Sequence, residues 1–367
     1  MSWEADPRQM RRALELARQG LGLTSPNPVV GAVVVQGGEI VGEGFHQRAG
    51  APHAEVLALA MAGPRAKGGT LYVTLEPCVH HGKTPPCLEA ILRAGIRRVV
   101  MAVKDPNPLV NGRGIQRLRE AGVDVAMGVE EEAATRLNQA FFKYITTGLP
   151  FVTLKAAMTL DGKIAARDGN SRWITGETAR AEVHRMRSQA DAILVGIGAL
   201  LIDDPRLTVR LDRPWPREPF RVVVDSHLRT PPDARTVRAG CPDRVIVACL
   251  EGASPERART LEAQGVQLLS LPASNGRVDV KSLMTALGER QIVSVLAEGG
   301  SEINGSLFEA GVVDRVACFI APLLIGGQSA LGAIGGEGRL LKEALHLRNM
   351  TYTQVGDDLL IEADVEP

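Results

Sequence analysis

The chain has 367 residues, 45% of them hydrophobic, and its formal net charge at pH 7 is zero. The length predicts two domains, and the zero net charge argues against a nucleic-acid partner, whose phosphates require a basic surplus. No apolar run is long enough to span a bilayer, and the N-terminus lacks the apolar core of a signal peptide. Five cysteines, an odd number, do not suggest a disulfide framework. We therefore expect a cytoplasmic protein with reduced thiols that acts on a small charged molecule, without a membrane partner.

The first part of the chain alternates strand and helix patterns. Residues 1–20 predict an amphipathic helix, and residues 29–44 predict a hairpin of two β-branched runs around a Gly-Gly turn. Further strands are expected at 68–77, 97–103 and 123–129, and helices at 53–63, 87–95 and 114–122. This alternation predicts an α/β domain with a mostly parallel sheet that helices cover on both faces.

A glycine and a proline between a helix end and a new strand place the domain boundary near Gly148. We expect one domain at residues 1–147 and a second at residues 148–367. The second domain begins another α/β series, with strands at 151–158, 191–197, 220–226, 244–250, 266–271, 292–300 and 315–322. No repeat of fixed period is present, which excludes a solenoid.

The segment TLEPCVHHGKTPPC, residues 74–87, contains two of the five cysteines. Cys78 and Cys87 each follow a proline, and Cys87 opens a predicted helix, whose N-terminus favours the thiolate form that a metal needs. His53 also follows a proline and opens a helix. We therefore expect His53, Cys78 and Cys87 to bind one zinc ion per chain, with the fourth position left open for water, as in catalytic zinc sites.

Glu55, two residues after His53, is suited to shuttle protons between that water and a substrate nitrogen. H-x-E followed by P-C-x-x-C is the signature of zinc deaminases, but here the second cysteine is delayed to Cys87. Other readings stay open at this point: buried structural thiols, a structural zinc with His80 or His81 as fourth ligand, a zinc-stabilised interaction module, or a nucleoside or nucleic-acid deaminase with an appended domain.

Longer motifs extend this pattern along the chain. The first domain contains SPNPVVGAVVV, HAEVLAL, TLEPCVHHGKTPPC and KDPNPLVNGRG, and the second contains LKAAMTLDGKIA, SRWITGETAR, ILVGIGALLIDDPRLTVR and LAEGG. With these motifs the chain resembles the bifunctional riboflavin-biosynthesis deaminase-reductase family over nearly its whole length. The resemblance implies a cytidine-deaminase-like three-layer α/β/α domain followed by a dihydrofolate-reductase-like α/β domain.

The resemblance also implies two reactions. The first domain would hydrolyse the 2-amino group of 2,5-diamino-6-ribosylamino-4(3H)-pyrimidinone 5′-phosphate, and the second would reduce the ribosyl group to ribityl with NADPH. Glu55 would be the proton shuttle of the zinc site. The implied substrate contacts of the first domain lie in the SPNP turn, the long loop and the KDPNP segment: Asn27, His80, Lys83, Asp105 and Asn107. Without the resemblance, SPNP and DPNP indicate only turns.

In the second domain no G-x-G-x-x-G motif follows the first strand, so the usual dinucleotide fingerprint is absent. Hydride transfer needs no protein nucleophile, only alignment of the nicotinamide with the first carbon of the sugar. By resemblance, Lys155 and Glu298 hold the ribose hydroxyls and assist proton transfer. The other implied substrate residues, two of them arginines suited to the 5′-phosphate, are Ser171, Arg187, Leu207 and Arg210.

The glycine-rich run LAEGGSEINGS leads into a helix whose N–H groups could bind a phosphate, and by resemblance it binds NADPH. The implied cofactor contacts are Ala157, Trp173, Ala199, Asp203, Ser226, Gly300, Ser301, Glu302, Ile303, Asn304, Gly305 and Ser306. The family pattern usually has threonine at Ala199, so one hydrogen bond to the cofactor is missing here. Because reductase domains of the family pair, we expect a homo-oligomer, specifically a dimer.

Overall fold

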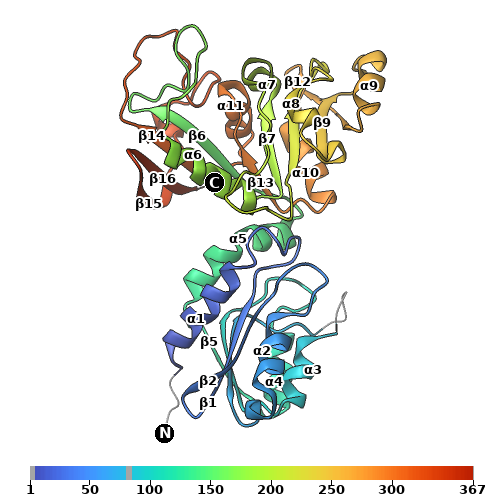
Figure 1. The fold of residues 1–367 in the computed structure, drawn as a ribbon, viewed down its shortest axis with the longest axis vertical. Helices are drawn as coiled ribbons and strands as arrows, with labels where there is room; N and C mark the ends of the chain where they lie inside the picture. The colour runs from blue at the N-terminus through green and yellow to red at the C-terminus, as the bar shows by residue number, and fades with distance from the viewer. Residues whose placement is uncertain (1–4, 80–84, 367) are drawn as a thin grey trace. The chain divides into compact units, whose positions relative to one another are not determined.

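The computed structural model describes residues 5–79 and 85–366. By its internal contacts the chain divides into two compact units, Met1–Gly148 and Leu149–Pro367 (Figure 1). Gly148 ends the last helix of the first unit with a φ of 75°, in the left-handed region that glycine adopts without steric cost. Of the helices in the described part of the chain, none has the length and apolar character required to span a bilayer.

The first unit is built on a five-stranded sheet with the order β2-β1-β3-β4-β5. Its strands are β1 (Gly31–Gln36), β2 (Glu39–Phe45), β3 (Thr70–Leu75), β4 (Arg98–Val103) and β5 (Asp124–Met127). Its α-helices are α1 (Pro7–Arg18), α2 (Ala54–Ala62), α3 (Cys87–Arg93), α4 (Arg113–Glu120) and α5 (Glu131–Thr147). The elements expected from the sequence are all present. The prediction of a mostly parallel sheet is wrong for this unit, because β1 pairs antiparallel with both β2 and β3.

Side chains that alternate along each strand form two cores, one on each face of this sheet. Val33 and Val100 pack with residues of α1 and α5, whereas Val34 and Val99 pack with residues of α2, α3 and α4. Figure 1 shows the same arrangement, with α1 and α5 on one side of the strands and α2, α3 and α4 on the other. The predicted three-layer α/β/α fold is confirmed.

Two glycines of β2 allow α2 to lie directly on the sheet. A Cβ atom at Gly42 would lie 2.1 Å from the carbonyl oxygen of Ala58, and one at Gly44 would lie 2.6 Å from that of Ala54. Real Cβ atoms do not approach backbone this closely, so any side chain here would push the helix away. These glycines therefore set the height of the N-terminus of α2 above the sheet, where His53 and Glu55 are located.

The second unit is built on a nine-stranded sheet with the order β10-β9-β8-β7-β13-β6-β14-β16-β15. Its strands are β6 (Phe151–Thr159), β7 (Ala192–Gly196), β8 (Phe220–Val224), β9 (Val245–Leu250), β10 (Gln267–Leu271), β13 (Ser294–Ala297), β14 (Arg315–Ala321), β15 (Leu347–Val355) and β16 (Asp358–Val365), and a separate two-stranded ribbon pairs β11 (Ala273–Ser274) with β12 (Arg277–Val278). Its α-helices are α6 (Glu177–Gln189), α7 (Ile197–Asp203), α8 (Arg235–Arg238), α9 (Pro255–Glu262), α10 (Val280–Glu289) and α11 (Ser301–Glu309).

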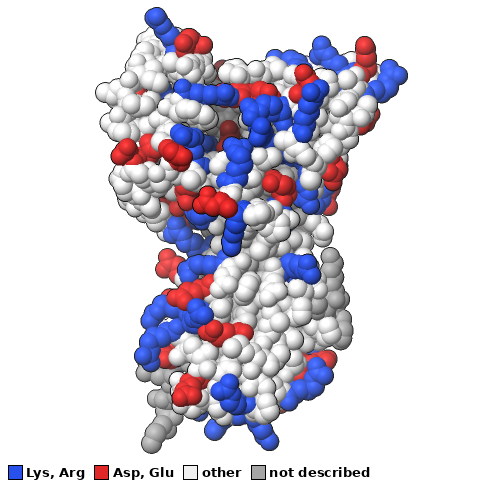
Figure 2. Space-filling view, in the orientation of Figure 1, with Lys and Arg blue, Asp and Glu red and all other residues white. Residues whose placement is uncertain are grey.

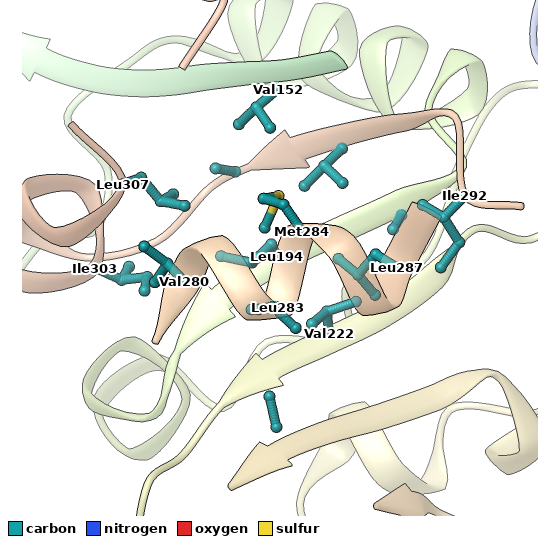
Figure 3. Close-up of a cluster of buried hydrophobic side chains, with 14 of the residues drawn as sticks. Val152, Leu194, Val222, Val280, Leu283, Met284, Leu287, Ile292, Ile303 and Leu307 are labelled. Carbon is teal, nitrogen blue, oxygen red and sulfur yellow. The ribbon is translucent and has the colours of Figure 1, made fainter. Parts of the chain in front are cut away.

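Helices cover both faces of this sheet, as the alternation of strand and helix patterns predicts. On one face Val152, Leu194 and Val222 pack against apolar residues of α10 and α11 (Figure 3). On the other face Ile193 and Val223 pack with residues of α7, α8 and α9. The pairings from β10 to β14 are all parallel, so the predicted α/β class is confirmed.

The sequence analysis did not identify the C-terminal hairpin. β16 pairs antiparallel with β14 on one side and with β15 on the other, which makes β15 an edge strand. The signal for β16 was present, because its run is apolar on both faces: Leu360 packs in one core cluster, and Ala363 packs with Val365 in another. β15 has no such alternation, and its residues are mostly exposed.

Candidate active sites

Three potential metal ligands converge in the first unit. His53 is the N-cap residue of α2, Cys78 lies just beyond the end of β3, and Cys87 is the first residue of α3. His53 Nδ1 lies 2.9 Å from Cys87 Sγ and 3.5 Å from Cys78 Sγ, and the two sulfur atoms are 3.5 Å apart. Within the described ranges, this is the only group of three or more His, Cys, Asp or Glu side chains that could hold a metal ion.

The donor atoms of this group fit zinc. Tetrahedral zinc binds thiolate sulfur and imidazole nitrogen, and its usual bond lengths place the ligand atoms about 3.5–3.8 Å apart. Two of the observed separations are 3.5 Å, and the third, between His53 Nδ1 and Cys87 Sγ, is about 0.6 Å shorter than this range, so an outward movement of these two side chains would admit the ion. Three protein ligands are typical of a catalytic site that keeps one position open. His80 and His81, the alternative fourth ligands, lie outside the described residues.

The two thiols influence each other's protonation. The hydrogen bond between the sulfur atoms lowers the pKa of Cys78 and raises that of Cys87, and the contact with His53 lowers the pKa of Cys78 further. Cys78 is therefore the more acidic thiol of the two, and Cys87 holds its proton more firmly despite its place at a helix start. A coordinating cation removes such a proton outright, so metal binding at this site is expected to release it.

Glu55 lies in the first turn of α2 and is buried, with 3% of its surface exposed. Burial raises the pKa of this carboxyl group, and the charge of Cys78 raises it further. An acid whose pKa is raised toward neutrality can both accept and return a proton near the operating pH. The geometry thus places a proton-transfer group beside the metal ligands.

His46 connects Asn27 to the metal ligands, because it contacts both Asn27 and His53. This histidine was not predicted from the sequence. The amide nitrogen of Asn27 lies 3.1 Å from Nε2 of His46, and Nδ1 of His46 lies 3.2 Å from the carbonyl oxygen of Pro52. The ring of His46 packs edge-on against that of His53, with centroids 5.2 Å apart. His46 has no recognisable motif around it, and only the folded hairpin shows its place.

Asp105 and Asn107 lie on the loop that follows β4, near the metal ligands. Asp105 is buried, and burial raises the pKa of its carboxyl group to about 6, with Glu76 and Cys78 adding to the effect. The predicted contacts Asn27, Asp105 and Asn107 are thus close to the cluster, whereas His80 and Lys83 lie outside the described residues.

The second unit has a cavity of about 800 Å³ at the carboxyl ends of its central parallel strands, where ligands of open α/β sheets usually bind. Every substrate or catalytic residue predicted for this domain lines it: Lys155, Ser171, Arg187, Leu207, Arg210 and Glu298. These side chains come from β6, α6, the segment between β6 and α6, and the segments after α7 and β13.

Three of the residues that line this cavity, Lys155, Arg187 and Glu298, form a buried ion cluster. Arg187 donates two hydrogen bonds to Glu298, with distances of 2.6 and 2.9 Å, and Lys155 Nζ lies 3.9 Å from Glu298 Oε2. Burial lowers the pKa of Lys155, and burial also opposes ionisation of Glu298, yet the paired Arg187 lowers the pKa of that carboxyl group. Arg187 is therefore largely engaged with Glu298, and exposed Arg210 has more free hydrogen-bonding capacity for a phosphate.

A second cavity of about 620 Å³ adjoins the first, since Ile164, Ser171, Ala199, Asp203 and Gly300 line both. Most predicted cofactor residues line the smaller cavity: Ala199, Asp203, Ser226, Gly300, Ser301, Glu302, Ile303 and Ser306. Ala157, Trp173 and Asn304 line the larger cavity instead. Gly305 lines neither, because a Cβ atom there would lie 2.5 Å from the carbonyl oxygen of Gly335.

Several basic residues at these cavities were not identified from the sequence. Arg172, Arg180, Arg206 and Arg235 line the larger cavity, and His227, Arg229 and Arg277 line the smaller one. In Figure 2, Lys and Arg side chains are concentrated on the visible face of the second unit. A basic lining attracts phosphorylated ligands. Only His227 and Arg229 follow a strand closely, β8, whereas Arg180, Arg235 and Arg277 lie within α6, α8 and β12, so no single local signal identifies the group.

His184 of α6 also lines the larger cavity, and its protonation makes stability depend on pH. Burial, together with the charges of Arg187 and Arg210, lowers its pKa to about 4. An unfolded histidine takes up a proton below about pH 6.5, whereas the folded one does so only near pH 4. The unfolded state therefore binds more protons in this window, and stability falls as the pH drops from 6.5 toward 4.

We expect the replacement His184→Gln to reduce this pH dependence. Urea unfolding followed by tryptophan fluorescence should show a smaller loss of stability between pH 7.5 and 5 in His184→Gln than in wild type; equal losses would contradict this.

The metal cluster with its buried acid, together with the two adjoining cavities, defines a zinc-dependent deaminase joined to a reductase. Residues 3–103 match the family model described as "Cytidine and deoxycytidylate deaminase zinc-binding region", and residues 150–361 match the one described as "RibD C-terminal domain". The chain belongs to the RibD family, the bifunctional deaminase-reductases of riboflavin biosynthesis. Zinc for the deaminase and NADPH for the reductase are the cofactors of such an enzyme, and its substrate is a small molecule.

Similarity to known proteins extends over both units. The chain is 47% identical to riboflavin biosynthesis protein RibD of Actinobacillus pleuropneumoniae, over 96% of this chain and 93% of the relative, and 46% identical to that of Escherichia coli, over 88% and 89%. Among solved structures it resembles RibD of Acinetobacter baumannii, with a TM-score of 0.89, 38% identity and coverage of 98% and 99%. It also resembles the deaminase/reductase of Thermotoga maritima, with a TM-score of 0.85, 38% identity and 98% coverage of both chains. Matches of this length disfavour a deaminase with an unrelated appended domain.

Proposed function

We propose that residues 1–147 deaminate 2,5-diamino-6-ribosylamino-4(3H)-pyrimidinone 5′-phosphate and that residues 148–367 then reduce its ribosyl group to ribityl with NADPH. The solved Thermotoga maritima relative is described as a diaminohydroxyphosphoribosylaminopyrimidine deaminase and 5-amino-6-(5-phosphoribosylamino)uracil reductase. The observation that carries the proposal is the pairing of a three-ligand metal cluster beside buried Glu55 in one unit with a basic cavity around Lys155 and Glu298 in the other.

In the deaminase, His53, Cys78 and Cys87 would hold zinc, whose Lewis acidity would make a water molecule nucleophilic near neutral pH. Glu55 takes a proton from that water at its carboxylate and delivers it to the departing amino group, which leaves as ammonia. The raised pKa of Glu55 suits both transfers. Asn27, Asp105 and Asn107 contact the base, and the further predicted substrate contacts, His80 and Lys83, lie outside the described residues.

In the reductase, the two adjoining cavities would hold NADPH, which would supply the hydride for the first carbon of the ribosyl group; the ring oxygen released from that carbon then needs a proton. Lys155 Nζ donates it, since a buried ammonium with a lowered pKa gives up a proton readily. Glu298 holds Lys155 and Arg187 in place and accepts from the ribose hydroxyls. Arg210 and Arg187 bind the 5′-phosphate, and Ser171 and Leu207 complete the substrate contacts.

For the cofactor we propose that the smaller cavity takes the adenosine and phosphate part of NADPH and that the nicotinamide enters the larger cavity through the shared opening. Ser226 lies on the adenosine side, and Gly300 at the N-cap of α11 lies at the opening. The other predicted contacts follow this path; Gly305 contributes through packing.

Ala199 lies in α7 and lines both cavities, at the point where NADPH would pass. Ala199→Thr adds a hydroxyl group that can hydrogen-bond to the cofactor, which is worth about 0.5–1.5 kcal/mol. We expect the KM for NADPH to fall about two- to tenfold, with the KM of the pyrimidine substrate unchanged. Steady-state kinetics with each reactant varied in turn measures both values. An unchanged or higher KM for NADPH would show that the cofactor does not contact this position.

We also propose that the enzyme is a cytoplasmic dimer. Cys78 and Cys87 must be reduced to bind zinc, and thiols stay reduced in the cytoplasm. The edge strand β15 leaves one row of backbone groups for another strand, and it exposes Leu347, Met350 and Tyr352, the last with 63% of its surface accessible. Pairing of two second units along β15 would cover these residues. Light scattering measures the mass in solution; a monomer would refute the dimer.

The test of the function follows both reactions in one sample. Wild type receives the diaminopyrimidine substrate and NADPH, and ammonia and NADPH absorbance are recorded together. We expect both signals, and we expect a zinc chelator to abolish ammonia release while NADPH is still oxidised when the deaminated intermediate is supplied. Ammonia release that survives complete removal of zinc would refute the deaminase proposal, and no NADPH oxidation with the deaminated intermediate would refute the reductase proposal.

A further inference from the structure

Glu76 is a buried acid beside the deaminase site, and the proposed mechanism gives it no role. It follows β3 directly, two residues before Cys78, and only 3% of its surface is exposed. Its carboxylate accepts four backbone hydrogen bonds. Oε1 accepts from the N–H groups of Gly114 and Ile115, at 2.9 and 3.2 Å, and Oε2 accepts from those of Gly112 and Asp105, at 2.9 and 3.3 Å.

Three of these donors belong to the start of α4. The first N–H groups of a helix have no partner within the helix, and a capping side chain normally accepts from them. Gly112 at the N-cap has no side chain that could do so. Glu76 supplies the acceptor from a different element, where its negative charge also complements the helix dipole. A Cβ atom at Gly114 would lie 3.0 Å from Glu76 Oε1, so this close approach requires glycine.

The fourth donor connects Glu76 to the residues proposed to contact the base. The N–H of Asp105 binds Glu76, Asp105 Oδ1 accepts from the N–H of Asn107 at 2.8 Å, and Asn107 Oδ1 accepts from the N–H of Leu109 at 3.0 Å. Three successive hydrogen bonds thus hold this loop, each from a backbone N–H to a side-chain oxygen earlier in the chain, and the first acceptor is Glu76. A shift of the carboxylate would move Asp105 and Asn107 together.

The backbone of Glu76 is part of the segment after β3 that also contains the metal ligand Cys78. Its N–H donates to the carbonyl oxygen of Val103 at 3.1 Å, and the chain continues through Pro77 to Cys78. One residue therefore connects the segment that supplies a zinc ligand to the loop that supplies base contacts.

We propose that Glu76 is a positioning residue of the deaminase, which sets the distance between the zinc ligands and the base contacts Asp105 and Asn107. This inference rests on the proposed deaminase function. Glu76 transfers no proton, because both of its oxygen atoms are engaged with backbone donors. Its effect on the reaction is geometric: a shift of Asp105 and Asn107 weakens two contacts with the bound substrate, and loss of both contacts costs about 10²-fold in substrate affinity.

Glu76→Gln tests this with minimal change of shape. The glutamine amide keeps one acceptor oxygen, but its NH₂ group faces two backbone N–H groups. Two of the four hydrogen bonds are therefore replaced by repulsion between donors. We expect kcat/KM for ammonia release to fall about 10²-fold, mainly through a higher KM. Zinc content and NADPH oxidation with the deaminated intermediate should match wild type. Glu43→Gln is the matched control, because it removes the charge of an acid of the same unit that pairs with Arg12, and it should leave KM unchanged.

A double-mutant cycle with Asp105→Ala separates positioning from a general structural role. If Glu76 acts through Asp105, Glu76→Gln raises KM much less in the Asp105→Ala protein than in wild type. Additive effects on KM, normal deamination by Glu76→Gln, a change in kcat alone, or loss of zinc from Glu76→Gln would each overturn the proposal. Failure of wild type to release ammonia would refute the proposed function itself, which the same assay detects separately.

Discussion

Glu55→Gln is expected to lower ammonia release by at least about 10³-fold while the protein keeps its zinc. Glutamine has the same shape as glutamate, so the packing of the first turn of α2 is preserved, but its amide cannot carry a proton between water and the departing amino group. The buried position of Glu55 means that bulk water cannot readily take over this transfer. Ammonia release and metal content, measured on the same preparation, test the prediction.

The second unit supplies the internal control for Glu55→Gln. NADPH oxidation by the variant should be normal with the deaminated intermediate and absent with the diaminopyrimidine, because that reduction depends on prior deamination. Ammonia release as fast as in wild type would show that Glu55 is not the proton shuttle. Loss of zinc together with activity would instead assign Glu55 a role in holding the metal ligands.

Lys155→Met is expected to lower NADPH oxidation by at least about 10²-fold and to leave ammonia release unchanged. Methionine fills a similar volume on β6 but has no proton to donate to the ring oxygen. Glu298 stays paired with Arg187 in this variant, so no buried charge is left alone. Removal of Glu298 would be less informative, because it would leave two buried cations without their partner, which is strongly destabilising.

Lys281→Met is the matched control for Lys155→Met, since Lys281 is an exposed lysine of α10 in the same unit. It should oxidise NADPH at the wild-type rate. Assays with the deaminated intermediate at saturating NADPH isolate the reductive step. A Lys155→Met protein that reduces normally would refute proton donation by Lys155, and the search for the donor would move to His184, which lines the same cavity.

Local patterns were sufficient for most of the secondary structure. The Gly37-Gly38 turn between two β-branched runs predicts the β1-β2 hairpin, and apolar runs bounded by turn residues predict β4 and β9, because these signals act over a few residues. The direction of β1 relative to β3 was not predictable in this way, since pairing between distant strands depends on packing of the whole sheet. The edge strand β15 was missed because an exposed strand needs no apolar alternation.

The zinc cluster could be predicted because coordination chemistry restricts the ligands to a few residue types. Two cysteines after prolines, and a histidine followed two residues later by Glu55, are rare enough to be recognised without structure. Roles of Ser171 or Ser226 required the resemblance, since a serine near a turn is uninformative alone. Both residues nevertheless line cavities in the structure.

By itself, then, the sequence determined the α/β class and the residues of the zinc cluster, which depend on local pattern and on side-chain chemistry; the boundary near Gly148 and the role of Glu55 are predictions on the same basis. Only the tertiary structure decided which backbone groups Glu76 accepts from and that His46 packs against His53. It also decided that Arg187 is engaged with Glu298. The physical reason is that hydrogen bonds and ion pairs between distant segments depend on distances of a few tenths of an ångström, which the packing of helices on the sheet sets.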